Sequence, residues 1–185
     1  MQAVKLCRHC GKEFAPARPL QAVCSPRCSF AEVRVAKRAE KAAERDSLKA
    51  RREKLKTIAD RIAEAQIEFN AYIRLRDKMA GFACISSGAA LDWSGNAVDA
   101  GHYRSTGAAS HLRFNSDNCH CQTKQENRYL AGNAADYRLG LIRRIGLARV
   151  EALESDNEPH KWSHAELIEI KAKYRAKRKT LDGNQ

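Results

Sequence analysis

Apolar side chains recur at steps of three and four residues in several parts of the chain, which is the spacing of an amphipathic helix. Glycines and a Ser-x-x-Glu capping-box sequence mark where these helices should begin and end. We expect helices from Leu55 to Met79 ended by Gly81, from Asn133 to Gly146 with a second piece over Leu147 to Leu153, and from Ser163 to about Leu181. The apolar faces of the first and last helices are Ile58, Ile62, Ala65, Phe69, Tyr72 and Ile73, and Leu167, Ile170 and Tyr174.

The pattern changes after residue 81, where short apolar runs alternate with turn residues. Over residues 82–98 this favours two short strands or a ragged hairpin, with Trp93 half buried. A further strand from Ala97 to Tyr103 would deliver His102 to its far end.

The segment from Phe30 to about Lys56 lacks proline and glycine and carries only a weak apolar stripe. Between Arg34 and Lys56 we count ten Lys or Arg residues against four Asp or Glu residues. This predicts a long, mostly solvated helix. It could lie along phosphates as an arm, pair with a second copy in a homodimer, or act as a charged spacer.

Composition narrows the class of protein. The chain has 185 residues and 43% apolar residues, but aromatics are only 6%, so small lobes are expected rather than one large core. The formal charge of +12 favours a polyanionic partner such as nucleic acid. Because no apolar run reaches the length of a membrane span or a secretory signal, we expect no membrane association and an intracellular, reducing setting.

The seven cysteines are therefore expected to be metal ligands or free thiols. Cys7 and Cys10 form one close pair, and Cys24 and Cys28 form a second. Four thiolates on two tight turns supply the ligands of a closed structural Zn²⁺ site. The second pair leads into Ser25-Pro26, which predicts a helix start.

Residues 99–133 carry the candidate chemistry, with a histidine on a strand followed by two asparagines. His102, Asn118 and Asn127 stand in the order of an HNH, or ββα-metal, nuclease site. In such a site His102 would be the general base, since a neutral imidazole accepts a proton near physiological pH. The Asn118 amide would hold the loop that orients His102, and the Asn127 carbonyl oxygen would bind Mg²⁺ or Mn²⁺.

A second ligand for this metal is harder to assign. Asp99 precedes His102 by three residues and would face the opposite side of a regular strand, but a bulge at Gly101 could bring both to one face. His120 is a further candidate. Phosphate contacts are expected from four basic residues around the cleft, namely Arg104, Arg113, Lys124 and Arg128.

The segments FNAYIRLRD, CISSG, DAGHYRSTGA, LRFN, ENRYLAGN, YRLGLIRRIG and ALESDNEPHKW resemble the NinG (Rap) recombination proteins of lambdoid phages, over nearly the whole chain. The resemblance implies a small phage-encoded nuclease in the cytoplasm of a bacterial host. Its implied substrates are branched recombination intermediates, Holliday junctions among them, and other phage recombination proteins are possible partners.

One departure from that family concerns a second zinc site. The family has four cysteines where this chain has Cys84, Ser87, Thr123 and Glu126, which do not make a closed zinc site. We expect hydrogen bonds among Ser87, Thr123 and Glu126 to replace the metal. Strand alternation would put Cys119 and Cys121 on one face and His120 on the other, which argues against a rearranged site.

The expected fold is α+β and mostly α. It comprises a zinc-knuckle lobe (residues 1–30), a long basic helical region (31–80), an HNH-like nuclease core (81–133) and C-terminal helices with a basic tail (134–185). The leading function is a magnesium-dependent, structure-selective DNA endonuclease. The alternatives are a junction-binding recombination accessory that does not cut, and a zinc-finger adaptor that works through partner contacts.

Overall fold

The computed structural model describes residues 4–183, which divide into two compact units between Lys56 and Thr57. The helical region predicted for residues 31–80 is split between them, because its first helix ends at Lys54 and its second begins at Ile58. Within the described residues, no helix is long and apolar enough to cross a bilayer.

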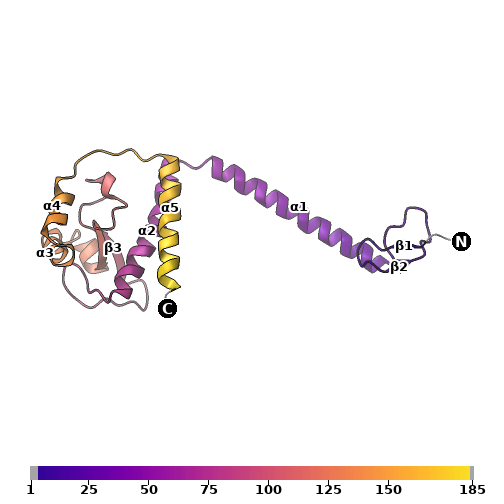
Figure 1. Cartoon of the computed structure of the whole chain (residues 1–185), viewed down its shortest axis with the longest axis horizontal. Helices are drawn as coiled ribbons and strands as arrows, with labels where there is room; N and C mark the ends of the chain where they lie inside the picture. Colours follow the sequence, from indigo (N-terminus) through magenta and orange to yellow (C-terminus); the bar gives the residue numbers. More distant parts are fainter. Residues whose placement is uncertain (1–3, 184–185) are drawn as a thin grey trace. The chain divides into compact units, whose positions relative to one another are not determined.

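The first unit contains a short hairpin and one long helix (Figure 1). Strands β1 (Lys5–Leu6) and β2 (Glu13–Phe14) pair antiparallel, and α1 spans Pro26–Lys54. The Ser25 hydroxyl caps α1 by accepting a hydrogen bond from the Cys28 backbone N–H at 3.3 Å, as the Ser-Pro sequence predicts. No residue of α1 is buried.

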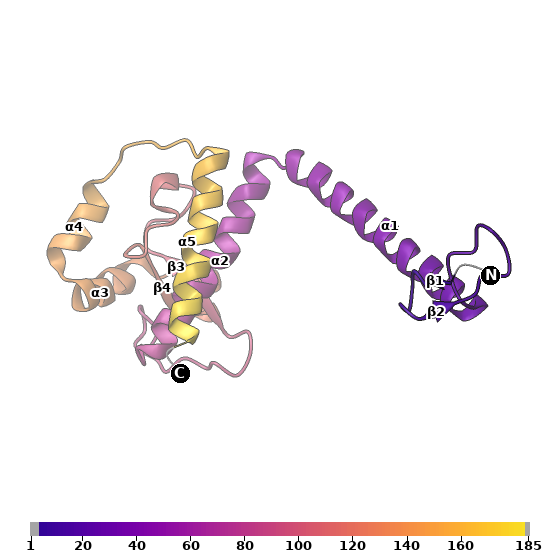
Figure 2. The same cartoon turned by 45° about the vertical axis from the view of Figure 1, so that its right-hand side comes forward.

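The second unit is built on two helices that lie side by side, α2 (Ile58–Met79) and α5 (His164–Asp182) (Figures 1 and 2). Each begins with a capping box, at Thr57–Asp60 and at Ser163–Glu166. Their apolar faces meet, and the rings of Phe69 and Tyr174 pack edge to face with centroids 4.8 Å apart. Two ion pairs tie the outer edge of this contact, Lys171 to Glu64 and Arg175 to Glu68, both at 2.9 Å.

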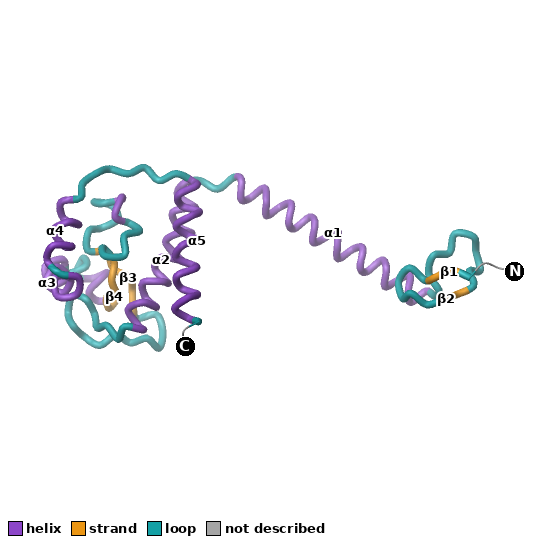
Figure 3. Tube along the Cα trace, in the orientation of Figure 1, coloured by secondary structure: helices purple, strands orange, loops and turns teal. Residues whose placement is uncertain are grey.

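An antiparallel ribbon packs against these helices. Strand β3 (Val98–His102) pairs with β4 (Cys119–Thr123), and Figure 3 shows how little of the chain is strand. The first core contains one ribbon face together with α2 and α5, whereas the second contains α3 (Ala134–Ile145) and α4 (Leu147–Ser155). A 3₁₀ turn, η1 (Ser110–Leu112), and a π-helical turn, η2 (Gln125–Tyr129), complete the unit.

The two strands expected over residues 82–98 are absent from the described structure, although Trp93 is half buried as predicted. Residues 84–89 form a tight turn instead: the Cys84 N–H donates to the Ala89 carbonyl, and the Gly88 N–H donates to the Cys84 carbonyl. The Ile85 N–H within this turn donates to the Cys121 carbonyl of β4 at 3.1 Å. The turn therefore satisfies its backbone groups through its own bonds and this single bond to β4, without a strand of its own.

Candidate functional site

The four N-terminal cysteines come together as the sequence predicts. The Sγ atoms of Cys7, Cys10, Cys24 and Cys28 all lie within 4.8 Å of one another, with Cys10–Cys24 at 3.6 Å and Cys24–Cys28 at 3.5 Å. Zn–S bonds of about 2.3 Å in a tetrahedron place sulfurs about 3.8 Å apart, so this set fits zinc. The Cys10 backbone N–H is the main cause that lowers the pKa of Cys7 to about 6, which favours a thiolate ligand.

A second turn has the backbone of a zinc knuckle without its ligands. In the first knuckle the Cys7 N–H donates to the Lys12 carbonyl and the Gly11 N–H donates to the Cys7 carbonyl, with a Gly11 φ of 72°. The turn at residues 84–89 repeats both bonds, and the φ of Gly88 is 70°. Among the described residues, however, the N-terminal cysteines form the one cluster of His, Cys, Asp or Glu suited to a metal.

The hydrogen bonds expected to replace this second metal are not formed between the three side chains. Ser87 Oγ accepts from the Ala89 N–H, Thr123 Oγ1 accepts from the Glu126 N–H, and a Glu126 carboxylate oxygen accepts from Asn133 Nδ2. Each side chain therefore bonds a nearby backbone group or Asn133, since these short side chains satisfy local donors before they reach one another.

The ribbon register decides which candidate residues share a face. Val98 to His102 pair with Thr123 to Cys119 without interruption, so no bulge occurs at Gly101. Side chains alternate along each strand, and directly paired residues share a face. His102 therefore lies on the face of Cys119 and Cys121, whereas Asp99, Gly101, His120 and Gln122 belong to the other face. The bulge expected to bring Asp99 and His102 to one face is not present.

His102 packs on the core side of the ribbon. Its Nε2 lies 2.9 Å from the Arg113 carbonyl oxygen, to which it donates, and its ring stacks on Phe69 with centroids 5.9 Å apart. Nδ1, which then carries the lone pair, lies 3.9 Å from Cys119 Sγ. Burial lowers the pKa of His102, so the ring is neutral at physiological pH.

Asn118 is fully buried beneath the loop that follows His102. Its Oδ1 accepts from the Arg104 N–H at 2.9 Å, and its Nδ2 donates to the carbonyls of Arg104 at 3.0 Å and Leu112 at 3.3 Å. Asn118 thereby fixes the backbone two residues beyond His102.

On the opposite face of the ribbon, two side-chain oxygens lie beside Gly101. A Cβ atom at Gly101 would lie 1.9 Å from Gln122 Oε1 and 3.0 Å from Asn127 Oδ1, so both oxygens occupy the space that a larger residue would fill. Asn127 Nδ2 donates to Asp99 Oδ2 at 3.1 Å, which places a carboxylate beside them. We call Asp99, Gly101, Gln122 and Asn127 the oxygen cradle.

Gln122 is the member that the sequence analysis missed. Its Nε2 donates to Ser86 Oγ and, at 2.8 Å, to the Gly132 carbonyl, which can only accept and so fixes the amide orientation. Oε1 is buried without a hydrogen-bond partner among the described residues. A buried carbonyl oxygen without a donor is suited to a cation, and oxygen ligands are those that Mg²⁺ or Mn²⁺ prefers. The cradle therefore fits such an ion.

Charge around the cradle keeps Asp99 ionised. Burial acts to raise the pKa of Asp99, but hydrogen bonds from Arg128, at 2.7 Å, and from Asn127 outweigh it, and the pKa lies below its usual value. His120, the other candidate ligand, is paired with Gly101 in the ribbon, but its side chain contacts two arginines instead of the cradle. Its Nδ1 is 2.9 Å from Arg76 Nη2 and 3.4 Å from Arg144 Nη1. Burial and these cations lower its pKa to about 3, and they leave no room at Nδ1 for a metal ion.

The four predicted phosphate-binding residues have different surroundings. Arg104 donates to the backbone carbonyls of Leu153 and Asp156 and so anchors the end of α4. Arg113 reaches Gln66 Oε1 at 3.3 Å and is partly buried. Arg128 pairs with Asp99 but keeps 59% of its side chain exposed, whereas the side chain of Lys124 has no ion pair or hydrogen bond within the part of the chain described here. Arg128 and Lys124 are therefore the two beside the cradle that remain open to a phosphate.

The sequence of the chain matches a family of phage proteins. The family model described as Bacteriophage Lambda NinG protein matches residues 1–184. The protein ninG of Salmonella phage P22 is 41% identical over 189 residues, covering 93% of this chain and 90% of the relative. The protein ninG of Escherichia phage lambda is also 41% identical over 189 residues, covering 93% and 89%. That of Escherichia phage 933W is 39% identical over 196 residues, covering 97% and 94%. No solved structure matches the chain.

Proposed function

The chain belongs to the NinG family of bacteriophage proteins, and from that premise we propose that it is a structure-selective DNA endonuclease that cuts branched recombination intermediates. The observation that carries the proposal is the oxygen cradle, where two amide oxygens lie beside Gly101 and the Asn127 amide also bonds the Asp99 carboxylate. The cradle belongs to the ribbon and to η2, and His102 follows Gly101 directly along β3.

Asp99, Gln122 and Asn127 would hold the divalent cation, Mg²⁺ or Mn²⁺. When bound, such an ion stabilises negative charge on a phosphate undergoing hydrolysis and lowers the pKa of a coordinated water. Arg128 neutralises Asp99, and its exposed guanidinium and Lys124 can contact phosphates on either side of the scissile bond.

His102 is the residue that would accept a proton, and because its ring lies on the core face of the ribbon, opposite the cradle, the ring must turn towards the substrate to do so. In hydrolysis a water oxygen attacks phosphorus, the bond from phosphorus to the leaving oxygen breaks, and the water proton passes to a base. The Arg113 carbonyl holds Nε2 as a donor and leaves Nδ1 as the basic nitrogen, while the lowered pKa keeps the ring neutral. Asn118 holds the following loop, and with it the strand end that carries His102.

A second function, a junction-binding recombination accessory that does not cut, is favoured by one observation. The His102 ring lies on the core face of the ribbon, opposite Asp99, and its Nδ1 faces Cys119. Under this alternative His102 is a packing residue, and the basic chain acts through DNA binding alone.

A cleavage assay separates the two functions. Labelled four-way and three-way junctions are incubated with Mg²⁺ or Mn²⁺, and binding is measured in parallel by fluorescence anisotropy. If the protein is an endonuclease, the wild type should cut the junctions. The variants Asn127→Ala and His102→Ala should each cut roughly 10²- to 10⁴-fold more slowly. Both variants should bind the junctions nearly as well as the wild type does. Asn96→Ala, at an exposed position, is the control that should cut normally. If wild type binds junctions but cuts none with either metal, the accessory function holds.

A further inference from the structure

Seven of the ten basic residues of α1 are arranged in a single row. They are separated by steps of seven, four, three, four, four and three residues. At 3.6 residues per turn these positions fall within an arc of about 80° of the helix circumference. All five acidic residues of α1 fall outside that arc: Glu32, Glu40, Glu44, Asp46 and Glu53. We call the seven the basic stripe: Arg27, Arg34, Arg38, Lys41, Arg45, Lys49 and Arg52.

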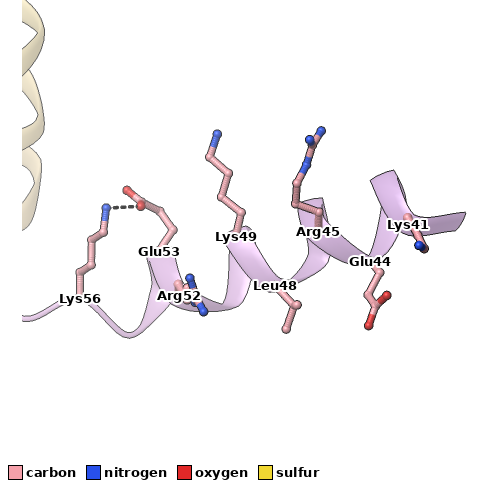
Figure 4. A pocket seen from close by; sticks show the side chains of 8 residues that line it. All are labelled: Lys41, Glu44, Arg45, Leu48, Lys49, Arg52, Glu53 and Lys56. Carbon is pink, nitrogen blue, oxygen red and sulfur yellow. Dashed lines mark ion pairs between the residues drawn. The ribbon is translucent and has the colours of Figure 1, made fainter. Parts of the chain in front are cut away.

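The side chains of the stripe are exposed and mostly uncompensated. Figure 4 shows Arg45 and Lys49 projecting from one side of the helix, while Glu44 and Leu48 project from another. Arg45 lies 3.8 Å from Asp46, and both side chains are more than 70% exposed, which makes this a weak pair. Within residues 4–183, no ion pair or side-chain hydrogen bond involves Arg34, Arg38, Lys41, Lys49 or Arg52.

Repulsion within the basic stripe lowers the stability of α1. Arg34 with Arg38, Lys41 with Arg45, and Arg45 with Lys49 are like-charged neighbours four residues apart, and each such pair destabilises a helix. An exposed helix that served only as a spacer would gain stability from alternating charges. A polyanion along the stripe removes the repulsion, so the row of charges indicates a bound polyanion.

The opposite faces of α1 narrow the choice of polyanion. A helix that lies on an anionic membrane needs a continuous apolar face to enter the bilayer. The large apolar residues of α1 do not form one, because Val35 falls on the opposite side of the stripe from Phe30, Val33 and Leu48, and the five acidic residues lie on both sides. A row of cations on average about 6 Å apart instead suits the regular charges of a phosphate backbone, which fall every 3.4 Å along each strand of a duplex. From Arg27 to Arg52 the stripe extends about 37 Å, close to one turn of B-form DNA.

We infer that the basic stripe of α1 binds the phosphate backbone of duplex DNA, as a contact surface separate from the oxygen cradle. The inference shares with the proposed function the premise that DNA is the ligand, but it requires no cleavage. Each cation of the stripe that meets a phosphate releases counterions, so the stripe adds affinity and salt dependence without sequence preference.

The test compares two triple variants of the full chain that remove the same charge. The stripe variant is Arg38→Gln, Lys49→Gln and Arg52→Gln, and the control is Lys12→Gln, Arg51→Gln and Lys54→Gln, which are exposed positions outside the stripe. Gln has nearly the helix propensity of Lys and Arg, and circular dichroism checks that α1 is retained. Binding to a junction with duplex arms is measured by anisotropy across a salt series, without added divalent metal.

We expect the stripe variant to bind roughly 10- to 100-fold more weakly at physiological salt, and its slope of log affinity against log salt to fall by about 2.7. In the control variant, the affinity and the salt slope should both change far less. Equal losses in the two variants would overturn the inference, because net charge alone would then explain them. So would a stripe variant that binds DNA normally but no longer binds vesicles of phosphatidylcholine and phosphatidylserine. If the wild type binds DNA without cutting it, the proposed function fails while this comparison still stands.

Discussion

Asn118 holds both backbone groups of Arg104 at once, accepting from its N–H at 2.9 Å and donating to its carbonyl at 3.0 Å. Replacing Asn118 with Ala leaves the N–H and the carbonyl of Arg104 without these partners, so we expect a loss of about 2–4 kcal/mol of unfolding free energy. Urea unfolding of the wild type and the variant measures it. Asn96→Ala, at an exposed position, should change stability by less than about 0.5 kcal/mol. A variant as stable as wild type would show that the loop is held by other contacts.

Gly101→Ala should close the oxygen cradle. The added Cβ would meet Gln122 Oε1 at 1.9 Å, so Gln122 must move and the two amide oxygens no longer converge. We expect Mn²⁺ binding, followed by electron paramagnetic resonance, to weaken at least tenfold. Gly95→Ala is the matched control, because a Cβ there meets no atom within 4 Å and binding should persist. Unchanged Mn²⁺ affinity in Gly101→Ala would place the ion elsewhere.

Zinc removal should affect the two units differently. A strong chelator is expected to unfold the segment around Cys7 to Cys28, which has few other apolar contacts, while residues 57–183 keep their cores. Limited proteolysis would then cleave the N-terminal segment first, and elemental analysis of the untreated protein should find one zinc per chain. Two zincs per chain would mean that the knuckle at residues 84–89 also recruits a metal.

Acid should weaken the second unit through Glu154. Its hydrogen bonds from Arg138, at 2.7 Å, and then from Tyr103 lower the pKa of Glu154 to about 2 from its usual 4.5. A carboxyl whose folded pKa is depressed contributes stability above its unfolded pKa, and that contribution is lost as pH falls from about 4.5 towards 2. Glu154→Gln should therefore unfold at a lower temperature than wild type at pH 7, with a smaller difference at pH 3. A difference that is the same at both pH values would contradict this account.

The helices were predictable because their signals are local. The three- and four-residue spacing of Ile58 to Ile73 and the capping box at Ser163 depend on neighbours in sequence, and both helices form where expected. The strands expected over residues 82–98 did not form, because a six-residue turn satisfies the same backbone groups. Short apolar runs do not distinguish these outcomes.

Several residues of the candidate site were predictable from the sequence, but the face of the ribbon on which each one lies was not. Asp99 and Asn127 were expected near a metal, and the structure joins them by a hydrogen bond. That Gln122 belongs with them depends on which residues face each other across the ribbon, and pairing register is a long-range property. A glutamine that follows Cys121 in a strand carries no signal of its own, and its role becomes visible once Gly101 is seen to leave space for its oxygen.

The pairing of α2 with α5 also sets the order in which the two units can form during translation. Lys171 and Arg175 each meet partners on α2 that are 107 residues earlier, so the face of α2 that α5 covers stays exposed until the last helix leaves the ribosome. At bacterial synthesis rates of up to about 20 residues per second, this interval lasts at least about 5 seconds. The cysteine cluster, by contrast, is complete once Cys28 has emerged, so the N-terminal unit can capture its metal while most of the chain is still being made.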